Sequence, residues 1–344
     1  MRIAIITDAW RPQVNGVVMT LSKTGENLEK IGHEVMYVTP DQFRTIACPS
    51  YKSIRLALFP GKKLHRLLDD FRPEAIHIAT EGPLGMAARS YCKRHGLKFT
   101  TSFHTQFPEY VRMRAPIPLS LTYNFVRWFH GAAVRTMVPT QRRLEALAER
   151  DFTNLCIWTR GVDTQLFRPR GKELFKGKRP MSLYMGRVAV EKNLEAYLAL
   201  DLPGSKVVVG DGPDMEMLRQ KYPDVCFTGY KFGEELAKHV SAADVFVFPS
   251  LTDTFGLVLL ESMACGVPVA AFPVAGPIDV VKNGETGVLD EDLHKAVLKA
   301  LELDPLKCRA YAEQHSWMAA TQQFAGYLYR NIPVQDESVP DYSS

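Results

Sequence analysis

Residues 245–268 read VFVFPSLTDTFGLVLLESMACGVP, and this stretch decides how the second half of the chain folds. The β-branched and aromatic run Val245–Phe248 predicts a buried strand. A polar loop follows, and the apolar segment after Phe255 predicts a helix that Gly266 can end as a C-cap. A strand that leads through a loop into a helix is the repeating unit of a parallel sheet covered on both faces.

This loop and helix also carry groups that can hold a ligand. The Phe255-Gly256 start leaves the first N–H groups of the helix, Gly256–Val258, without carbonyl partners, and their partial positive charge suits a diphosphate. Asp253 lies just before the helix, where a plain N-cap is the alternative reading. Glu261 lies inside the apolar helix, so its carboxylate must find hydroxyl or N–H partners.

The same rhythm extends outward along the chain. Apolar runs predict further strands at residues 3–7, 35–39, 75–79, 99–103, 136–139, 182–185, 206–209 and 268–272. Helical patterns such as Leu21–Ile31, which Gly32 can end, separate most of them. The pattern restarts near residue 181 after the polar stretch Pro169–Pro180, which is typical of an interdomain linker. We therefore expect an α/β protein of two Rossmann-like, doubly wound domains that face each other across a cleft.

The predicted bounds are 1–165 for the first domain and 166–315 for the second. Residues 316–344 are expected to form a helix that crosses back toward the first domain, followed by a polar tail that frays. In such folds ligands bind beyond the carboxyl ends of the strands. The glycine-rich turns at these ends do not match the dinucleotide fingerprint, because Gly210-Asp211-Gly212 is followed by Met215 where a third glycine is required. This argues against a dehydrogenase.

Composition excludes several classes of protein. The 344 residues are 46% hydrophobic and 23% charged, which is typical of a globular chain. No window offers about 18 uninterrupted apolar residues, and the first apolar run ends at Asp8, too early for a secretory signal. The six cysteines lie far apart without a Cys-x-x-Cys pair, so we expect neither a zinc site nor disulfides, and a reducing cytosol.

Charge is distributed unequally. Residues 1–160 hold 23 Lys and Arg against 13 Asp and Glu, whereas the rest holds 19 against 25. A basic half favours a phosphate-bearing or anionic partner, with a solvated surface that has no partner as the alternative. No recognised RNA-binding motif accompanies the charge, so we expect no nucleic-acid partner.

Six segments in order along both predicted domains resemble the retaining, nucleotide-sugar-dependent glycosyltransferases of the GT-B fold, the family of bacterial mannosyltransferases and sulfoquinovosyl-diacylglycerol synthases. The most specific is Pro249–Pro268, which is similar to the family's two carboxylates eight positions apart; here Asp253 stands where the first Glu is usual. The resemblance runs from Met1 to about Arg330. Its other segments are Pro12–Gly16, Thr101–His104, Gly161–Asp163 with Leu166–Pro169, Gly186-Arg187 with Glu191–Asn193, and Gly210–Pro213.

The resemblance implies a role for each matching residue. It makes Arg187 and Lys192 the basic pair on the donor's diphosphate, Glu261 the partner of the ribose hydroxyls, and Asp253 and His104 contacts of the transferred sugar. Gly16 would lie in the loop that closes over that sugar. The remaining predicted donor-binding residues are Phe255, Gly256, Leu257 and Val258 around the diphosphate, and Tyr230 and Lys231 in the nucleobase pocket. Plain surface cations at 187 and 192 and a structural core histidine at 104 are the alternatives.

The implied reaction separates a sugar carbon from a nucleoside diphosphate with retention of configuration. Because negative charge develops on the leaving oxygen, fixed cations and the helix start can stabilise the transition state, and we expect no metal or other cofactor. The triplet Asp290-Glu291-Asp292 resembles a metal-binding signature of another glycosyltransferase fold, but it precedes a helical pattern and fits a helix N-terminus better. The donor would be linked to UDP or GDP.

Two segments dense in aromatic and basic residues favour a lipid acceptor such as diacylglycerol or a glycolipid. They are residues 52–66 and residues 107–130. Basic side chains beside exposed apolar ones suit an anionic membrane surface, so we expect a cytoplasmic protein bound peripherally to the inner membrane face. The alternatives are that these aromatics form a helix core, that the enzyme is a GDP-mannose-dependent mannosyltransferase with a non-lipid acceptor, that it is a nucleotide-sugar epimerase or hydrolase, or that it binds sugar nucleotides without catalysis.

Overall fold

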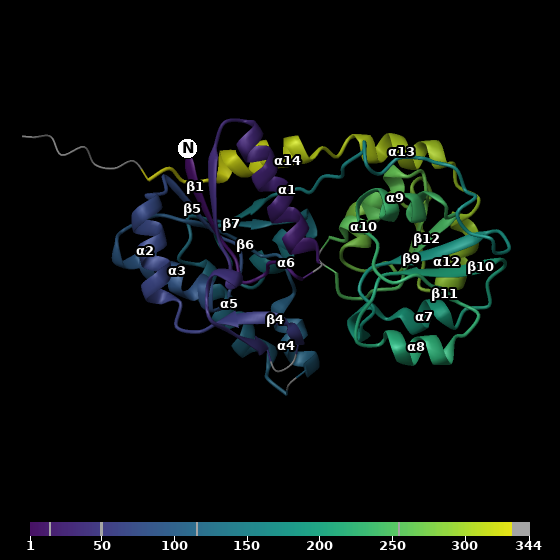
Figure 1. Cartoon of the computed structure of the whole chain (residues 1–344), viewed down its shortest axis with the longest axis horizontal. Coiled ribbons are helices and arrows are strands. Elements are labelled where there is room, and N and C mark those ends of the chain that lie inside the picture. The colour runs from purple at the N-terminus through teal and green to yellow at the C-terminus, as the bar shows by residue number, and fades with distance from the viewer. Residues whose placement is uncertain (14, 49–50, 115, 254, 332–344) are drawn as a thin grey trace, which may run out of the picture.

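The computed structural model describes residues 1–13, 15–48, 51–114, 116–253 and 255–331. It contains two α/β halves that lie side by side, each built on a six-stranded parallel sheet (Figure 1). The polar tail beyond residue 331, predicted to fray, lies outside the described residues.

The first half has the strand order β2-β1-β5-β6-β7-β8. Its strands are β1 (Arg2–Ile6), β2 (Glu34–Val38), β5 (Ala75–Ile78), β6 (Thr100–Ser102), β7 (Arg135–Val138) and β8 (Leu155–Ile157). Its helices are α1 (Gly16–Lys30), η1 (Pro40–Gln42), α2 (Gly61–Phe71), α3 (Pro83–Arg94), α4 (Phe107–Arg114), α5 (Leu119–His130) and α6 (Gln141–Ala148), and an antiparallel hairpin, β3 (Thr45–Cys48) with β4 (Tyr51–Ala57), lies apart from the sheet.

The second half has the order β11-β10-β9-β12-β13-β14. Its strands are β9 (Met181–Met185), β10 (Ser205–Val209), β11 (Cys226–Phe227), β12 (Val245–Phe248), β13 (Val269–Ala271) and β14 (Gly287–Leu289). Its helices are η2 (Val190–Lys192), α7 (Leu194–Leu198), α8 (Met215–Lys221), α9 (Gly233–Ser241), α10 (Leu257–Ala264), α11 (Pro277–Val280), α12 (Leu293–Ala300) and α13 (Pro305–Glu313). Each sheet reverses its strand order between two central strands, β1 and β5 in the first half and β9 and β12 in the second, and such switch points are where ligands bind.

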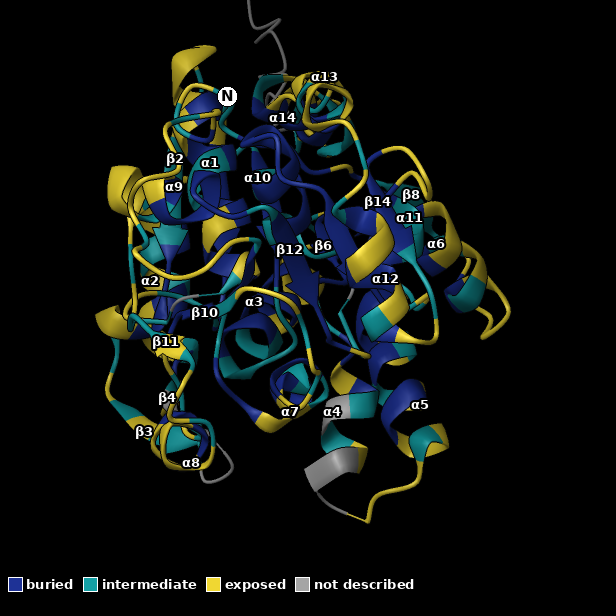
Figure 2. Cartoon of the chain, turned by 90° about the vertical axis from the view of Figure 1, so that its right-hand side faces the viewer, coloured by how far each residue is buried: buried dark blue, intermediate teal, exposed yellow. Residues whose placement is uncertain are grey.

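Burial explains why these segments became strands. The runs IAII at 3–6 and VFVF at 245–248 are almost wholly inaccessible, because helices cover both faces of each sheet (Figure 2). The predicted strands are therefore present, and no strand end is shifted by more than one residue. The hairpin, β8, β11 and β14 were not predicted, because they are short or only half-buried and carry a weaker apolar signal.

The chain crosses between the halves twice, at neighbouring places. After β8 it runs into the second half, and after α13 it returns as α14 (Trp317–Tyr327), which packs beside α1 (Figure 1). Val162 donates its N–H to the carbonyl of His315 at 3.0 Å, and a β-carbon on Gly161 would lie 2.3 Å from the backbone nitrogen of Trp317. The two crossings are thus packed backbone to backbone.

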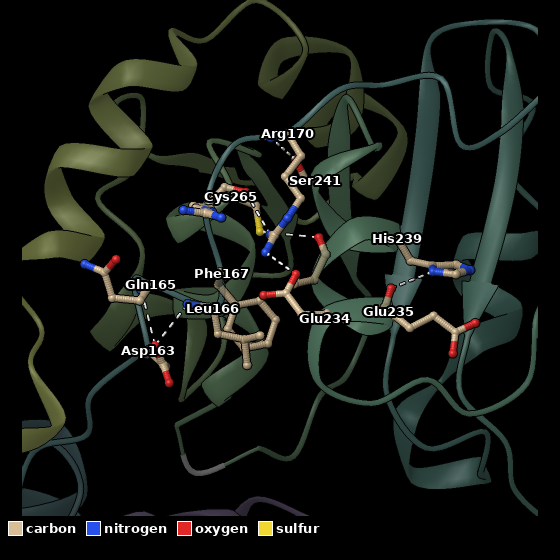
Figure 3. A network of polar contacts seen from close by, with 12 residues as sticks. Asp163, Gln165, Leu166, Phe167, Arg170, Glu234, Glu235, His239, Ser241 and Cys265 are labelled. Carbon is tan, nitrogen blue, oxygen red and sulfur yellow. Dashed lines mark hydrogen bonds and ion pairs between the residues drawn. The ribbon is translucent and has the colours of Figure 1, made fainter.

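The polar stretch Pro169–Pro180 is not a free linker. The backbone N–H of Arg170 donates to the Ser241 hydroxyl at 2.6 Å, and its guanidinium pairs with Glu234 at 2.7 Å (Figure 3). Lys172 pairs with Asp244 at 2.6 Å, and Phe167 enters the core of the second half. The stretch lies between β8 of the first sheet and β9 of the second, and polar composition does not reveal the side chains that anchor it to the second half.

Asp8, at the end of β1, caps the distant helix α3. Its carboxylate accepts hydrogen bonds from the N–H groups of Leu84 at 2.9 Å and Gly85 at 3.3 Å and from the hydroxyl of Thr80 at 2.9 Å. Burial raises its pKa to about 6. Asp8→Ala is expected to lower the free energy of unfolding by about 2–3 kcal/mol, because three donors lose their acceptor. Urea denaturation measures this.

The matched control is Asp304→Ala. Asp304 caps α13 through one exposed hydrogen bond, to the N–H of Leu306 at 2.9 Å, so we expect a loss of about 1 kcal/mol or less. Equal losses in the two variants would contradict the buried cap.

Candidate functional site

The predicted donor residues lie on two loops that leave adjacent strands of the second sheet. Arg187 and Lys192 follow β9, and Asp253 follows β12. Because β9 and β12 pair in parallel, their carboxyl ends meet at one edge of the sheet. Arg187 lies in the loop before η2, Lys192 is the last residue of η2, and Asp253 lies in the loop that leads into α10.

Each predicted cation is paired with a carboxylate. The Lys192 ammonium lies 2.7 Å from both carboxylate oxygens of Asp253, and the Arg187 guanidinium forms an ion pair with Glu191. The side chain of Glu191 is 6% exposed and that of Arg187 is 21% exposed. A diphosphate here would therefore share its two cations with two carboxylates.

A buried tyrosine joins these groups. The hydroxyl of Tyr184 donates to the carbonyl of Arg187 at 2.8 Å. Burial raises its pKa well above the ordinary value, the negative charge of Asp253 raises it further, and Arg187 opposes this. Tyr230 also raises the pKa of this phenol, so Arg187, Asp253 and Tyr230 all lie near the Tyr184 side chain.

The two predicted nucleobase residues have different surroundings. The ring of Tyr230 is 39% exposed and stacks on Phe232 with centroids 5.9 Å apart. Lys231 pairs with Glu235 at 2.8 Å, on the exposed side of α9.

The start of α10 faces the first half of the molecule. Gly256 precedes the helix with φ at +84°, a left-handed conformation that favours glycine, so the chain turns sharply before Leu257 and Val258. The first N–H groups of the helix have no carbonyl within it. A β-carbon on Gly16, at the start of α1, would lie 3.7 Å from the Leu257 side chain, so the two predicted loops meet.

Glu261 lies in the middle of α10 and is partly buried. Burial raises the pKa of its carboxyl from the ordinary 4.5 to about 7. Among the residues that the structure describes, no side chain or backbone N–H hydrogen-bonds this carboxylate. A partly buried carboxylate that no described protein group hydrogen-bonds can, when ionised, accept hydrogen bonds from ligand hydroxyls.

His104 contributes from the first half, on the loop after β6. Its side chain is buried, its Nδ1 lies 3.4 Å from Nη2 of Arg160, and burial together with that cation holds its pKa well below the usual range. Two residues on, the Gln106 amide donates to the carbonyl of Asp253 at 3.4 Å, which connects this loop to the second half.

A second contact between the halves is the ion pair of Arg142 on α6 with Asp279 on α11, at 3.6 Å. Beside it lies a cavity of about 220 Å³ between the halves. It is lined by Pro139, Thr140, Gln141, Ile157, Thr159 and Arg160 from the first half and by Phe255, Asp279, Val280, Tyr311 and His315 from the second.

The acidic triplet at 290–292 belongs to a helix start. Asp292 caps α12 by accepting from the N–H groups of His294 and Lys295 at 3.0 and 3.2 Å, and Asp290 pairs with Lys295 at 3.1 Å. No group of three His, Cys, Asp or Glu side chains within the described ranges is arranged to hold a metal ion.

Sequence reasoning missed four residues of this region: Glu191, Tyr184, Gln106 and Arg160. The ion pair of Arg187 with Glu191 joins the loop after β9 to η2, where the helical four-residue rule gives no signal. Gln106 and Arg160 had no signal either, because their contacts join positions far apart in the chain.

Comparisons with known proteins match both halves. A family model described as "Glycosyltransferase Family 4" matches residues 14–166, and one described as "Glycosyl transferases group 1" matches residues 179–303. The "GDP-mannose-dependent alpha-mannosyltransferase" of Mycobacterium tuberculosis is 30% identical over 84% of this chain and 83% of its own length. The "Sulfoquinovosyl transferase SQD2" of Arabidopsis thaliana is 30% identical over 88% and 68%. The "Alpha-monoglucosyldiacylglycerol synthase" of Streptococcus pneumoniae is 27% identical over 89% and 79%.

Solved structures agree on the fold. The sucrose-phosphate synthase of Thermosynechococcus elongatus superposes with a TM-score of 0.73 at 23% identity, over 94% of this chain and 97% of that one. Anabaena Alr3699/HepE, solved in complex with UDP and glucose, gives 0.71 at 14% identity over 95% and 98%.

Proposed function

This chain belongs to the family 4, group 1 glycosyltransferases, retaining hexosyltransferases of the GT-B fold that use a nucleotide-sugar donor, and we propose that its acceptor is a lipid at an anionic membrane surface. The proposed donor is a hexose linked to UDP or GDP. Diacylglycerol and glycolipids are the proposed acceptor class, which the name of the Streptococcus pneumoniae relative supports.

The proposed chemistry follows from the geometry of the donor half. Arg187, Lys192 and the start of α10 would stabilise the negative charge that develops on the leaving diphosphate. His104 and Asp253 would orient the transferred sugar, and Glu261 the ribose. The acceptor hydroxyl would attack from the side of the leaving group, and a phosphate oxygen would take its proton. In this proposal the charge is balanced without a metal ion.

The observation that supports a membrane surface most directly is Phe59. Its side chain is 95% exposed, and its φ of +48° is unusual for an aromatic residue. Leu58, exposed at 39%, precedes it, and α2 follows with Lys62 and Arg66 exposed. Helix α2, which carries Lys62 and Arg66, lies on the part of the first half that is remote from the second half (Figure 1).

The second predicted segment, 107–130, divides between core and surface. Val126 and Phe129 are fully buried, as the helix-core alternative requires, whereas Leu121 is 61% and Trp128 is 51% exposed. The side chains of Lys52, Tyr110 and Arg114, which belonged to the two predicted clusters, lie outside the described residues. Among the described helices, none is both long and apolar enough to cross a membrane.

Phe59→Ser is expected to weaken binding to vesicles of anionic lipid about ten- to thirtyfold, because an inserted phenyl ring contributes about 1.5–2 kcal/mol. Lys62→Ala is expected to weaken it about fivefold, at about 1 kcal/mol per cation. Co-sedimentation at two salt concentrations measures both.

The matched control is Leu306→Ser, which removes an apolar side chain that is 75% exposed on the second half. Its binding should equal that of the parent. Absence of parent binding at low salt would remove the membrane surface from the proposal.

Incubation of the protein with a panel of GDP- and UDP-sugars and a membrane lipid extract tests the acceptor, with product masses as the readout. A glycosylated lipid is the expected product. Free sugar would indicate a hydrolase. Transfer of mannose from GDP-mannose to a non-lipid acceptor only would favour the second candidate, which the name of the Mycobacterium tuberculosis relative supports.

A further inference from the structure

Arg160 is a buried cation at the junction of the two halves. It is 4% exposed and lies just after β8, beside the cavity between the halves. Its Nη1 donates to the carbonyls of Trp158 at 2.6 Å and Thr159 at 3.1 Å. Its guanidinium also stacks over the Trp158 ring at 4.2 Å. Both the carbonyls and the ring are neutral partners.

Within the described ranges, no carboxylate lies within 4.0 Å of this guanidinium. Burial lowers its pKa to about 9, so it remains a cation at neutral pH. A buried charge without an opposite charge opposes folding. Such a group is a candidate for a functional role, and the role must be sought in what the guanidinium contacts.

The remaining polar contact of Arg160 is to His104, where Nη2 lies 3.4 Å from Nδ1. A guanidinium has only donors, so Nδ1 must accept and cannot carry a hydrogen. The neutral imidazole then carries its hydrogen on Nε2. The contact therefore selects one of the two tautomers of His104.

The other groups around His104 act in the same direction. His77 is fully buried between the hydroxyls of Thr100 and Ser102, each at 2.9 Å, and burial lowers its pKa to about 3. His130, hydrogen-bonded to Glu81 at 3.0 Å, disfavours a charge on His104. The ring centroids of His104 and Trp158 lie 5.8 Å apart. Arg160, His77 and His130 thus disfavour the protonation of His104.

We propose that Arg160 is a positioning residue, which holds His104 in the neutral form with its hydrogen on Nε2, so that His104 donates a hydrogen bond to a hydroxyl of the transferred sugar. The last step rests on the proposed function. The tautomer itself does not, because it follows from the contact of Arg160 alone. Arg160 acts through His104 and contacts no substrate in this proposal.

The first experiment measures the tautomer in the full chain without any substrate. Nitrogen NMR of protein labelled with ¹⁵N-histidine, with the resonance assigned by its loss in His104→Gln, should show Nδ1 bare and Nε2 protonated from about pH 5.5 to 8.5. A hydrogen on Nδ1, or titration of His104 near pH 6.5, would overturn the proposal. This result stands whether or not the protein transfers a sugar.

The second experiment compares Arg160→Met with Arg160→Lys. In Arg160→Met we expect kcat to fall about tenfold, KM for the donor to stay within about twofold, and activity to be lost at a higher pH than in the parent as the pH falls, because removal of the cation raises the pKa of His104 although its burial remains. Arg160→Lys retains a donor and a charge and should restore most of the parent's profile. The control is Arg179→Met on the exposed side of the second half.

A parent-like pH profile and tautomer in Arg160→Met would contradict the positioning role. If Arg160→Met does not fold, the tautomer of the parent alone decides the proposal. A correct tautomer in a protein that transfers no sugar would overturn the proposed function and leave the Arg160 contact established.

Discussion

Lys192→Ala should lower kcat by about 10²–10³-fold while the protein stays folded. The Lys192 ammonium donates hydrogen bonds to the carboxylate of Asp253, in the loop before α10, where the leaving diphosphate is proposed to bind. Removal of one preformed group that stabilises developing negative charge has effects of this size. Initial rates with saturating donor, together with urea denaturation of the variant, measure the two quantities.

The control is Lys221→Ala on α8, which breaks a comparable pair with Glu195 at 2.6 Å on the surface of the same half. Its kcat should equal that of the parent. His104→Ala should be assayed beside Lys192→Ala, and parent-like activity in both variants would remove the proposed site.

Loss of the ammonium also leaves Asp253 without its counter-charge, and a bare carboxylate repels a diphosphate. Addition of Asp253→Asn to Lys192→Ala separates the two effects. We expect the double variant to bind the donor more tightly than Lys192→Ala, because the repelling carboxylate is gone. Its kcat should remain low, because the ammonium that stabilises the leaving diphosphate is still missing. Full recovery of kcat would show that repulsion alone explained the loss.

Much of the fold was predictable because its evidence is local. The apolar runs at 3–6 and 245–248 are buried on both faces, and such strands are readable without knowledge of their neighbours. Glu261 could be selected as a candidate site residue for the same reason, since a carboxylate in an apolar helix requires partners. The hairpin at 45–57 pairs only with itself, outside both sheets, and its half-buried residues gave no comparable signal.

What the sequence could not provide is the pairing of charges. Asp253 was assigned to a sugar and Lys192 to a diphosphate by resemblance, and nothing in the sequence predicts that they hold each other. Arg160 and His104 lie 56 positions apart, and their contact exists only because β6 and β8 lie in one sheet. Contacts of this kind depend on topology, which residue periodicity does not encode.

Glu261→Gln should weaken donor binding by about 10²-fold. An ionised carboxylate can accept hydrogen bonds from both ribose hydroxyls, each contributing about 1.5–3 kcal/mol, whereas the amide can accept at one atom only and is neutral. Calorimetric titration with UDP and GDP measures the affinity. The control is Glu302→Gln, an exposed carboxylate on the same half, which should bind like the parent.

The same burial makes donor binding and stability depend on pH in opposite directions. Because the folded protein raises the pKa of Glu261 from 4.5 to about 7, its contribution to stability is complete below about pH 4.5 and is lost as the pH rises through about 7. At pH 8 the free energy of unfolding of Glu261→Gln should therefore exceed that of the parent by about 1–2 kcal/mol, as measured by urea denaturation. At pH 5 this difference should disappear. Donor binding needs the ionised form, so at pH 6 the parent should release a proton on binding and Glu261→Gln should not. Titrations in two buffers of different ionisation enthalpy measure that proton, and its absence in the parent would mean that Glu261 does not receive the donor.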